Sequence, residues 1–189
     1  VAVVSHGESG RSQVGVTRSR DTALSGQYEI PYGFGPAPTN FGMITTRHMH
    51  EYGTTLEQWA QVAVSTRQWA ALNPKARFRD PLTIEDVLKS RPVCYPFNLL
   101  NICLVTDAGG AAVLTRADRA KNCAKPPVYI WGAGEGSEHV SVSQMHNLTF
   151  SEATRKSGEK AFAIAGVTHK DFNHIMLYDA FTSGPPIML

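Results

Sequence analysis

The sequence has little charge and no long apolar run. Charged residues make up 18% of the 189 residues and hydrophobic residues 42%, so the charged fraction lies below the roughly 25% typical of globular domains. Eighteen basic and 16 acidic residues leave a net charge of +2, and neither sign forms a run. This balance excludes a polybasic surface, and no apolar stretch reaches the roughly 20 residues of a transmembrane helix. We therefore expect a cytoplasmic protein with no membrane span and no nucleic-acid partner.

Cysteine is scarce as well, and its spacing excludes a disulfide framework. The three cysteines are an odd number, form no CxxC pair and suit a reducing compartment; they are Cys94, Cys103 and Cys123. The chain is long enough for one domain, or two small ones, with a buried core. It opens on an apolar β-branched run and closes on an apolar tail, which indicates a piece of a longer protein.

Helical periodicity and capping patterns predict three helices. The first begins at a Thr54-x-x-Glu57 capping box and ends at Asn73, before a proline. A shorter helix is expected over residues 83–89, and a third over residues 151–166, between a serine N-cap and a terminal glycine. By contrast, residues 11–50 are rich in Gly, Pro, Ser and Thr and predict one long loop.

Short apolar runs predict buried strands between these helices. The runs cover residues 1–4, 111–115, 128–131 and 174–178. The alternation of strands and helices predicts an α/β protein.

Two patterns have both a functional and a plain structural interpretation. The GxGxG sequence of residues 132–136 is similar to a nucleotide-binding loop, but its spacing and the β-branched residues that follow favour a strand-exit turn. His48 and His50 would face the same way on a strand and could begin a zinc site, but no third ligand lies at suitable spacing.

A serine hydrolase is a third alternative. Ser9 follows a strand as a hydrolase nucleophile does, and Asp107 and His174 could complete a triad. Arg11 stands where that motif needs glycine, which counts against this interpretation.

The strongest local signal is Tyr178-Asp-Ala-Phe, at the exit of the strand expected at residues 174–178. Ligands of open α/β sheets bind at the carboxyl ends of strands, and helix N-termini stabilise negative charge. A phenol there can donate to an oxyanion, or shuttle a proton if its pKa of ~10 is lowered. The alternative interpretation, equally favoured by the sequence, is that Tyr178 is an amphipathic residue packed at the rim of a sheet. Cys103 likewise precedes an expected turn at Thr106-Asp-Ala-Gly-Gly, and the strand at residues 111–115 follows that turn.

Several segments, taken in order, resemble the thiolase superfamily, and most nearly its sterol-carrier and lipid-transfer-protein branch. The segments that carry the resemblance are residues 1–12, 41–46, 59–79, 83–92, 103–113, 128–137 and 178–181. The first is similar to the strand and turn that follow the helix with the family's nucleophile. The last stands where other members carry Asn-Glu-Ala-Phe or His-Asp-Cys-Phe.

The resemblance implies a layered αβα thiolase-like fold with an inserted loop domain, only partly present. The implied division is residues 1–12 for the end of the N-terminal half, 13–103 for the loop or covering domain, 104–125 for the last strand and helix of the N-terminal half, and 126–189 for the start of the C-terminal half. The family's nucleophilic cysteine would precede this chain and its Gly-His-Pro and Cys-Gly-Gly elements would follow it. No cysteine here therefore inherits the nucleophile's role.

The resemblance further implies an enzyme of the acetyl-CoA acetyltransferase type, which makes or cleaves a carbon–carbon bond in an acyl-CoA thioester of lipid or sterol side-chain metabolism. Tyr178 and Asp179 are the implied catalytic pair: the phenol polarises a carbonyl or moves a proton, and Asp179 supports it at a helix start. The implied substrate-binding residues are Cys103, Asp107, Gly109, Phe181 and Met43. No metal is implied, and no cofactor other than the CoA thioester as substrate.

Two alternatives to acyl transfer remain, and the first follows from the tyrosine, which replaces the family's Asn or His. A phenol can remove the proton of a β-hydroxyl, so a retro-aldolase that acts on steroid side-chain CoA thioesters fits as well. A non-catalytic scaffold that binds lipid or acyl-CoA is the other. The resemblance also implies a homodimer and a small OB-fold partner protein associated with acyl-CoA.

Overall fold

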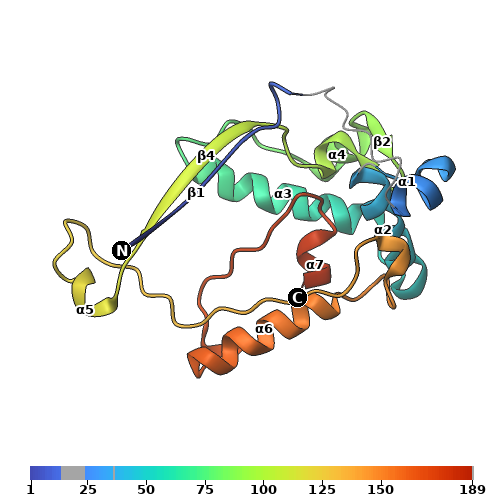
Figure 1. The fold of residues 1–189 in the computed structure, drawn as a ribbon. Helices are drawn as coiled ribbons and strands as arrows, with labels where there is room; N and C mark the ends of the chain where they lie inside the picture. Colours follow the sequence, from blue (N-terminus) through green and yellow to red (C-terminus); the bar gives the residue numbers. More distant parts are fainter. Residues whose placement is uncertain (14–23, 36, 189) are drawn as a thin grey trace.

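The computed structural model describes residues 1–13, 24–35 and 37–188. Within them the chain forms two antiparallel two-stranded sheets and seven α-helices (Figure 1). The strands are β1 Ala2–Ser9, β2 Pro92–Cys94, β3 Phe97–Asn98 and β4 Asp107–Leu114. The helices are α1 Leu24–Tyr28, α2 Ala37–Tyr52, α3 Leu56–Leu72, α4 Ile84–Lys89, α5 Ala117–Ala120, α6 Glu152–Ala165 and α7 Gly184–Met188. Short 3-10 helices span Ile30–Tyr32, Leu99–Asn101, Val142–Gln144 and His169–Asp171. The predicted α/β class is confirmed.

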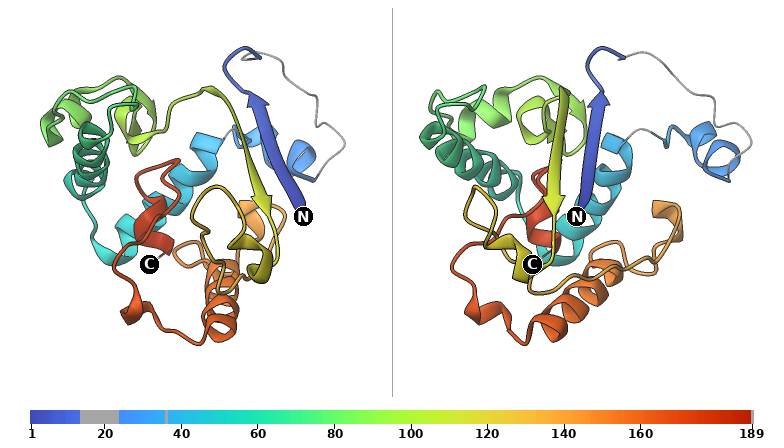
Figure 2. Two further views of the ribbon diagram at one scale, coloured as in Figure 1. Left: turned by 90° about the vertical axis from the view of Figure 1, so that its left-hand side faces the viewer. Right: turned by 60° about the vertical axis from the view of Figure 1, so that its left-hand side comes forward.

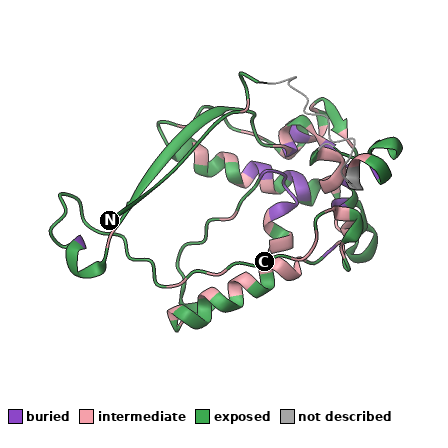
Figure 3. Cartoon of the chain, in the orientation of Figure 1, coloured by how far each residue is buried: buried purple, intermediate pink, exposed green. Residues whose placement is uncertain are grey.

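The β1–β4 sheet and the buried core occupy different parts of the molecule. β1 and β4 pair along their full length, from Ala2 opposite Leu114 to Ser9 opposite Asp107, and run side by side in both views of Figure 2. Buried residues gather instead around α2, α3, α4 and α7, whereas the β1–β4 sheet is exposed on both faces (Figure 3). No helix in the described part of the chain is long and apolar enough to cross a membrane.

Local capping signals place α3 and α4 nearly where the sequence predicts them. The N-cap of α3 is Thr55, one residue later than expected, and it forms a capping box with Gln58. The side chain of Thr54 bonds instead to a histidine of α2. Thr83 caps α4 and forms a capping box with Asp86, which confirms the helix predicted at residues 83–89.

Helix α2 is absent from the sequence prediction, which expects a loop over residues 11–50. The part of that loop at residues 14–23 and 36 lies outside the described residues. Pro38 stands in the first turn of α2, where a backbone N–H has no partner in the helix. At Gly42 a Cβ atom would lie 2.8 Å from the Tyr95 carbonyl oxygen. Tertiary packing on the β2–β3 connection therefore overrides a sequence with weak helix propensity.

The strands predicted at residues 1–4 and 111–115 exist but are longer than expected and exposed. Val3 is 66% exposed and Val113 70%, because no layer of the described chain covers either face of this sheet. β4 begins at Asp107, so Gly109 and Gly110 lie inside the strand and do not form the expected turn. The strands predicted at residues 128–131 and 174–178 are wrong: both segments pair with no strand in the described chain.

The glycines of residues 132–136 pack on helix α6, which runs as predicted from an N-cap at Ser151 to a left-handed Gly166. A Cβ atom on Gly132, Gly134 or Gly136 would lie 2.2, 2.0 and 2.1 Å from the carbonyl oxygens of Ala161, Ser157 and Ala153. These carbonyls are one helical turn apart, and alternate residues of an extended chain share one side. The glycines of the GxGxG pattern therefore allow this segment to pack directly on helix α6. This packing role removes the structural basis of the nucleotide-loop alternative.

The buried core consists of two clusters. The first joins α3 to α4 through Ala60, Val64 and Val87. The second surrounds Phe181, whose ring centroid lies 4.4 Å from that of Phe41 on α2 and 5.1 Å from that of Phe97 on β3. Phe97 is 1% exposed and Phe181 4%. The second cluster fixes α2 against the segment that follows Tyr178.

Candidate active site

Two segments far apart in the sequence lie side by side at the centre of the candidate site. The amide of Cys103 donates to the Ala180 carbonyl at 2.9 Å, and the amide of Thr182 donates to the Asn101 carbonyl at 2.9 Å. Between these bonds the segments form one antiparallel bridge, at Phe181. The structure thus brings together Cys103 and Phe181, two residues that the sequence resemblance assigns to substrate binding.

Buried polar side chains hold the same turn. Asn101, 5% exposed, donates through Nδ2 to the Thr182 hydroxyl at 3.2 Å. The hydroxyl of Ser183 lies 2.8 Å from the hydroxyl of Thr45 on α2. The sequence predicts none of these four residues, because the partners are 81 and 138 positions apart and leave no local pattern.

Tyr178 stands where the chain enters this turn, with its side chain exposed. The residue is 70% exposed and lines neither of the two cavities described below. Asp179 accepts a hydrogen bond from the Thr66 hydroxyl of α3 at 3.4 Å. The expectation that Asp179 begins a helix is wrong, because α7 starts only at Gly184. Asp179 instead ties the segment to α3, and the catalytic role of Tyr178 stays a prediction.

Asp107 and Gly109 lie on β4, in the exposed β1–β4 sheet. The Asp107 carboxylate accepts hydrogen bonds from the Ser12 hydroxyl and from the amides of Ser12 at 3.0 Å and Arg11 at 2.8 Å. The Ser12 hydroxyl and these amides lower the pKa of Asp107. Gly109 lies opposite Gly7 and borders a hollow of about 430 Å³ over the sheet. Asp107 therefore orders the turn after β1.

The serine-hydrolase alternative has no assembled triad. Ser9 is opposite Asp107 in the strand register, but the Asp107 carboxylate is bonded to the turn after β1. His174 packs edge-on against Trp69 of α3, with ring centroids 6.3 Å apart. Ser9 also ends its strand in a turn without the helix that a hydrolase nucleophile needs directly after it.

The two histidines considered for zinc lie on a helix, not on a strand, and point to different sides of it. His48 contacts Tyr52 and Trp59, with ring centroids 4.7 and 5.2 Å away, and its Nδ1 lies 3.0 Å from the Thr54 hydroxyl. His50 lines a cavity instead. Across the described residues no three Cys, His, Asp or Glu side chains gather as metal ligands.

We expect the melting temperature to fall as the pH drops from about 7 to 5.5, in part because of His48. Partial burial lowers the pKa of His48, and the nearby Glu51 carboxylate acts in the opposite direction. An unfolded histidine binds its proton near pH ~6.5. Below this pH the unfolded state therefore holds more protons than the folded state, and stability is lost. Thermal melts of the unaltered protein and of His48→Gln measure the effect. An equally steep profile for His48→Gln would assign the loss to other groups.

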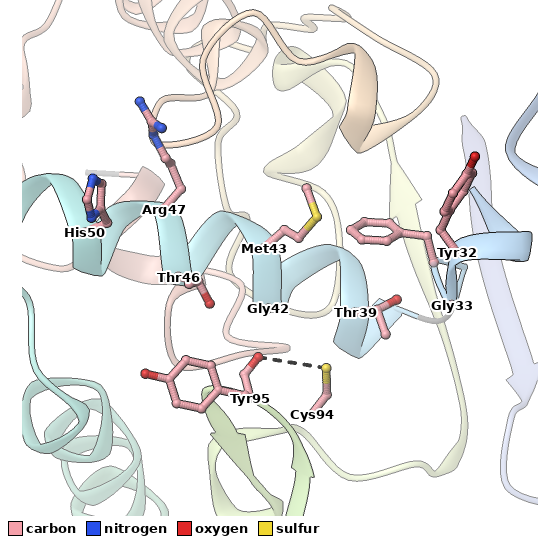
Figure 4. A pocket seen from close by; sticks show the side chains of 11 residues that line it. Tyr32, Gly33, Thr39, Gly42, Met43, Thr46, Arg47, His50, Cys94 and Tyr95 are labelled. Carbon is pink, nitrogen blue, oxygen red and sulfur yellow. Dashed lines mark hydrogen bonds between the residues drawn. The ribbon is translucent and has the colours of Figure 1, made fainter. Parts of the chain in front are cut away.

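A cavity of about 480 Å³ opens along α2 (Figure 4). Its size lies within the range of small-molecule pockets. Residues that line it include Tyr32, Met43, Arg47, His50, Cys94 and Tyr95. Met43 follows Phe41 by two positions, about 200° around the helix, so it faces away from the Phe181 cluster. The structure therefore does not bring Met43 together with the other predicted site residues.

Comparison with known proteins finds a matching family model, similar curated proteins and a similar solved structure. The model of the thiolase C-terminal domain-like family matches residues 134–189. The chain is 37% identical to a steroid side-chain-cleaving aldolase of Thermomonospora curvata, over 81% of this chain and 40% of that protein. It is 32% identical to an acetyl-CoA acetyltransferase of Methanothermobacter thermautotrophicus, over 85% of this chain and 42% of that protein. The solved Ltp2-ChsH2(DUF35) aldolase superposes with a TM-score of 0.85 at 33% identity, covering 96% of this chain and 49% of that one. The chain thus spans less than half the length of these relatives.

Proposed function

This chain belongs to the thiolase superfamily, on its sterol-carrier-like branch, and on that premise we propose that it takes part in making or cleaving a carbon–carbon bond in an acyl-CoA thioester. One of the relatives described above is named as a steroid side-chain-cleaving aldolase and the other as an acetyl-CoA acetyltransferase. In this proposal CoA enters as the substrate's carrier and no resident cofactor takes part.

The observation that carries the proposal is the setting of Tyr178. The phenol is 70% exposed, while every residue from Asp179 to Ser183 has a hydrogen-bond or bridge partner in the structure. These contacts hold the backbone that follows the phenol, and from that position the hydroxyl can donate to charge that develops on a thioester oxygen. The same hydroxyl, once deprotonated, can remove a proton from a substrate.

A retro-aldolase is the second candidate, and Tyr178 favours it. In that reaction a base removes the proton of the β-hydroxyl, and the Cα–Cβ bond breaks to release a ketone or aldehyde. The electron pair moves to the thioester as an enolate, which a proton then quenches to give a shorter acyl-CoA. The acyl-transfer reaction differs because free CoA takes up the acyl fragment from a β-ketoacyl-CoA. The relative with the higher identity is named as an aldolase.

The consumption of free CoA separates the two reactions. The intact protein is incubated with β-hydroxyacyl-CoA or β-ketoacyl-CoA of one acyl chain, with and without free CoA, and products are quantified by mass spectrometry. We expect cleavage of at least one substrate. Acyl transfer consumes one CoA for each bond broken, and retro-aldol cleavage consumes none. The saturated acyl-CoA without a β-oxygen is the control and stays intact. Binding of the thioesters without cleavage of either would overturn the proposal in favour of the scaffold.

We also propose partners for the intact protein. The similar solved structure is named as an aldolase with a DUF35 component. A small OB-fold partner of that kind, a homodimer of this protein and a cytoplasmic location fit the proposed activity. Size-exclusion chromatography with light scattering, alone and with such a partner, tests the assembly.

A further inference from the structure

Helix α2 also contacts the turn after Tyr178. It does so through two residues, Phe41 in the stack on Phe181 and Thr45 in the hydroxyl contact with Ser183. Each lies 138 or more positions from its partner, and the pairs are one helical turn apart on α2. Helix α2 and the turn are therefore joined by one apolar and one polar contact.

The polar contact is closed to water. Thr45 and Ser183 both have 0% exposure. The Thr45 hydroxyl also lies 2.7 Å from the Phe41 carbonyl oxygen, besides its 2.8 Å contact with Ser183. A hydroxyl carries a single proton and a carbonyl oxygen only accepts. Thr45 therefore either donates to the Phe41 carbonyl and accepts from the Ser183 hydroxyl, or donates to the Ser183 hydroxyl itself. Removal of either hydroxyl leaves the other buried without this partner, and water cannot replace it.

We infer that Thr45 is a positioning residue for the reaction: its hydroxyl, through Ser183, sets where the turn presents the phenol of Tyr178. The inference rests on the function proposed above. The segment after Tyr178 is anchored at both ends: Asp179 accepts a hydrogen bond from Thr66 of α3, and Ser183 contacts Thr45 of α2. Tyr178 itself is exposed. A displacement of about 1 Å at a reacting group can cost about 10²-fold in rate. Loss of the Thr45 hydroxyl therefore acts on kcat.

The test compares Thr45→Val, which keeps the shape and removes the hydroxyl, with Thr45→Ser, which keeps the hydroxyl. All kinetics use the intact protein at a temperature where circular dichroism shows every variant folded. We expect Thr45→Val to lower kcat about 10- to 100-fold with KM changed less than about twofold, and Thr45→Ser to restore kcat to within about threefold. Thr115→Val, directly after β4, makes the same chemical change elsewhere and leaves kcat unaltered. If Thr45→Val does not fold, Ser183→Ala removes the same bond from the other side.

A second readout does not depend on activity. 3-Fluorotyrosine at position 178 reports its surroundings through its ¹⁹F signal. We expect Thr45→Val and Ser183→Ala each to shift or broaden this signal. The double variant should change the signal little more than either single variant does, because both remove the same contact. Thr45→Ser should restore the signal of the unaltered protein. An unmoved signal in Thr45→Val, or an unchanged kcat in an active protein, overturns the inference. A moved signal in a protein that cleaves no thioester leaves the positioning role standing and overturns the proposed function.

Discussion

Replacement of Tyr178 by phenylalanine is expected to lower kcat of the intact protein by about 10²- to 10⁴-fold, the range for loss of a general acid or base. The substitution removes one hydroxyl and no carbon atom. Because the residue is 70% exposed, we expect the melting temperature to stay within about 2 °C of the original. KM should change little, because the hydroxyl acts on charge that develops in the transition state. Steady-state kinetics with the thioester that the intact protein cleaves measure both constants.

The matched control is Tyr28→Phe. Tyr28 is a similarly exposed tyrosine, 68%, at the end of α1, and its loss of a hydroxyl should leave kcat unchanged. The pH dependence of kcat in the unaltered protein adds a second criterion. A limb of the profile that disappears in Tyr178→Phe assigns the phenol to proton transfer, and a uniform fall across pH assigns it to hydrogen-bond donation. Full activity of Tyr178→Phe would remove this residue from the mechanism, and the proposal would lose its main support.

The helices with local signals could be predicted from the sequence, and α2 could not. Thr83 and Ser151 are N-caps whose partners lie three residues away, so the pattern is complete within a short window. Helix α2 carries one glycine, one proline and three threonines, and its stability comes from contacts with residues far along the chain. Gly42 approaches the Tyr95 backbone and Thr45 pairs with Ser183. Such contacts override propensity and leave no trace in the local sequence.

The same distinction applies to the candidate site. The resemblance to a family selected Cys103 and Phe181, and the structure places them in adjacent segments, although they are far apart in sequence. The resemblance also implies Met43 as a substrate-binding residue, but Met43 lies on the side of α2 that faces the cavity. The side that a residue occupies depends on whether its segment is a helix, and the sequence predicts a loop at this segment. The sequence predicts Asp107 in a turn because two glycines follow it, but both glycines lie in β4 and pair with residues of β1.

Gly134→Ala is expected to destabilise the protein by about 3 kcal/mol or more, or roughly 6–12 °C in melting temperature, as overpacking against a rigid element does. The new Cβ atom would lie 2.0 Å from the Ser157 carbonyl oxygen and 3.1 Å from the Ala161 amide nitrogen of α6. These are backbone atoms inside a helix, so no side-chain rotation can relieve the clash. Either α6 moves away as a body or the extended segment separates from it. Thermal melts followed by circular dichroism at 222 nm measure the loss.

Gly158→Ala provides the control, because it places the same methyl group on the other partner of this contact. A Cβ atom at Gly158, inside α6, has no heavy atom within 4 Å. Alanine is favoured over glycine in a helix interior by up to about 1 kcal/mol, so this variant should melt slightly higher than the unaltered protein. A lower melting temperature for Gly134→Ala together with a higher one for Gly158→Ala would show that the close contact with α6, and not the loss of glycine itself, causes the destabilisation. If Gly134→Ala melted as high as Gly158→Ala, the glycines of residues 132–136 would not pack directly on α6, and their spacing would need another explanation.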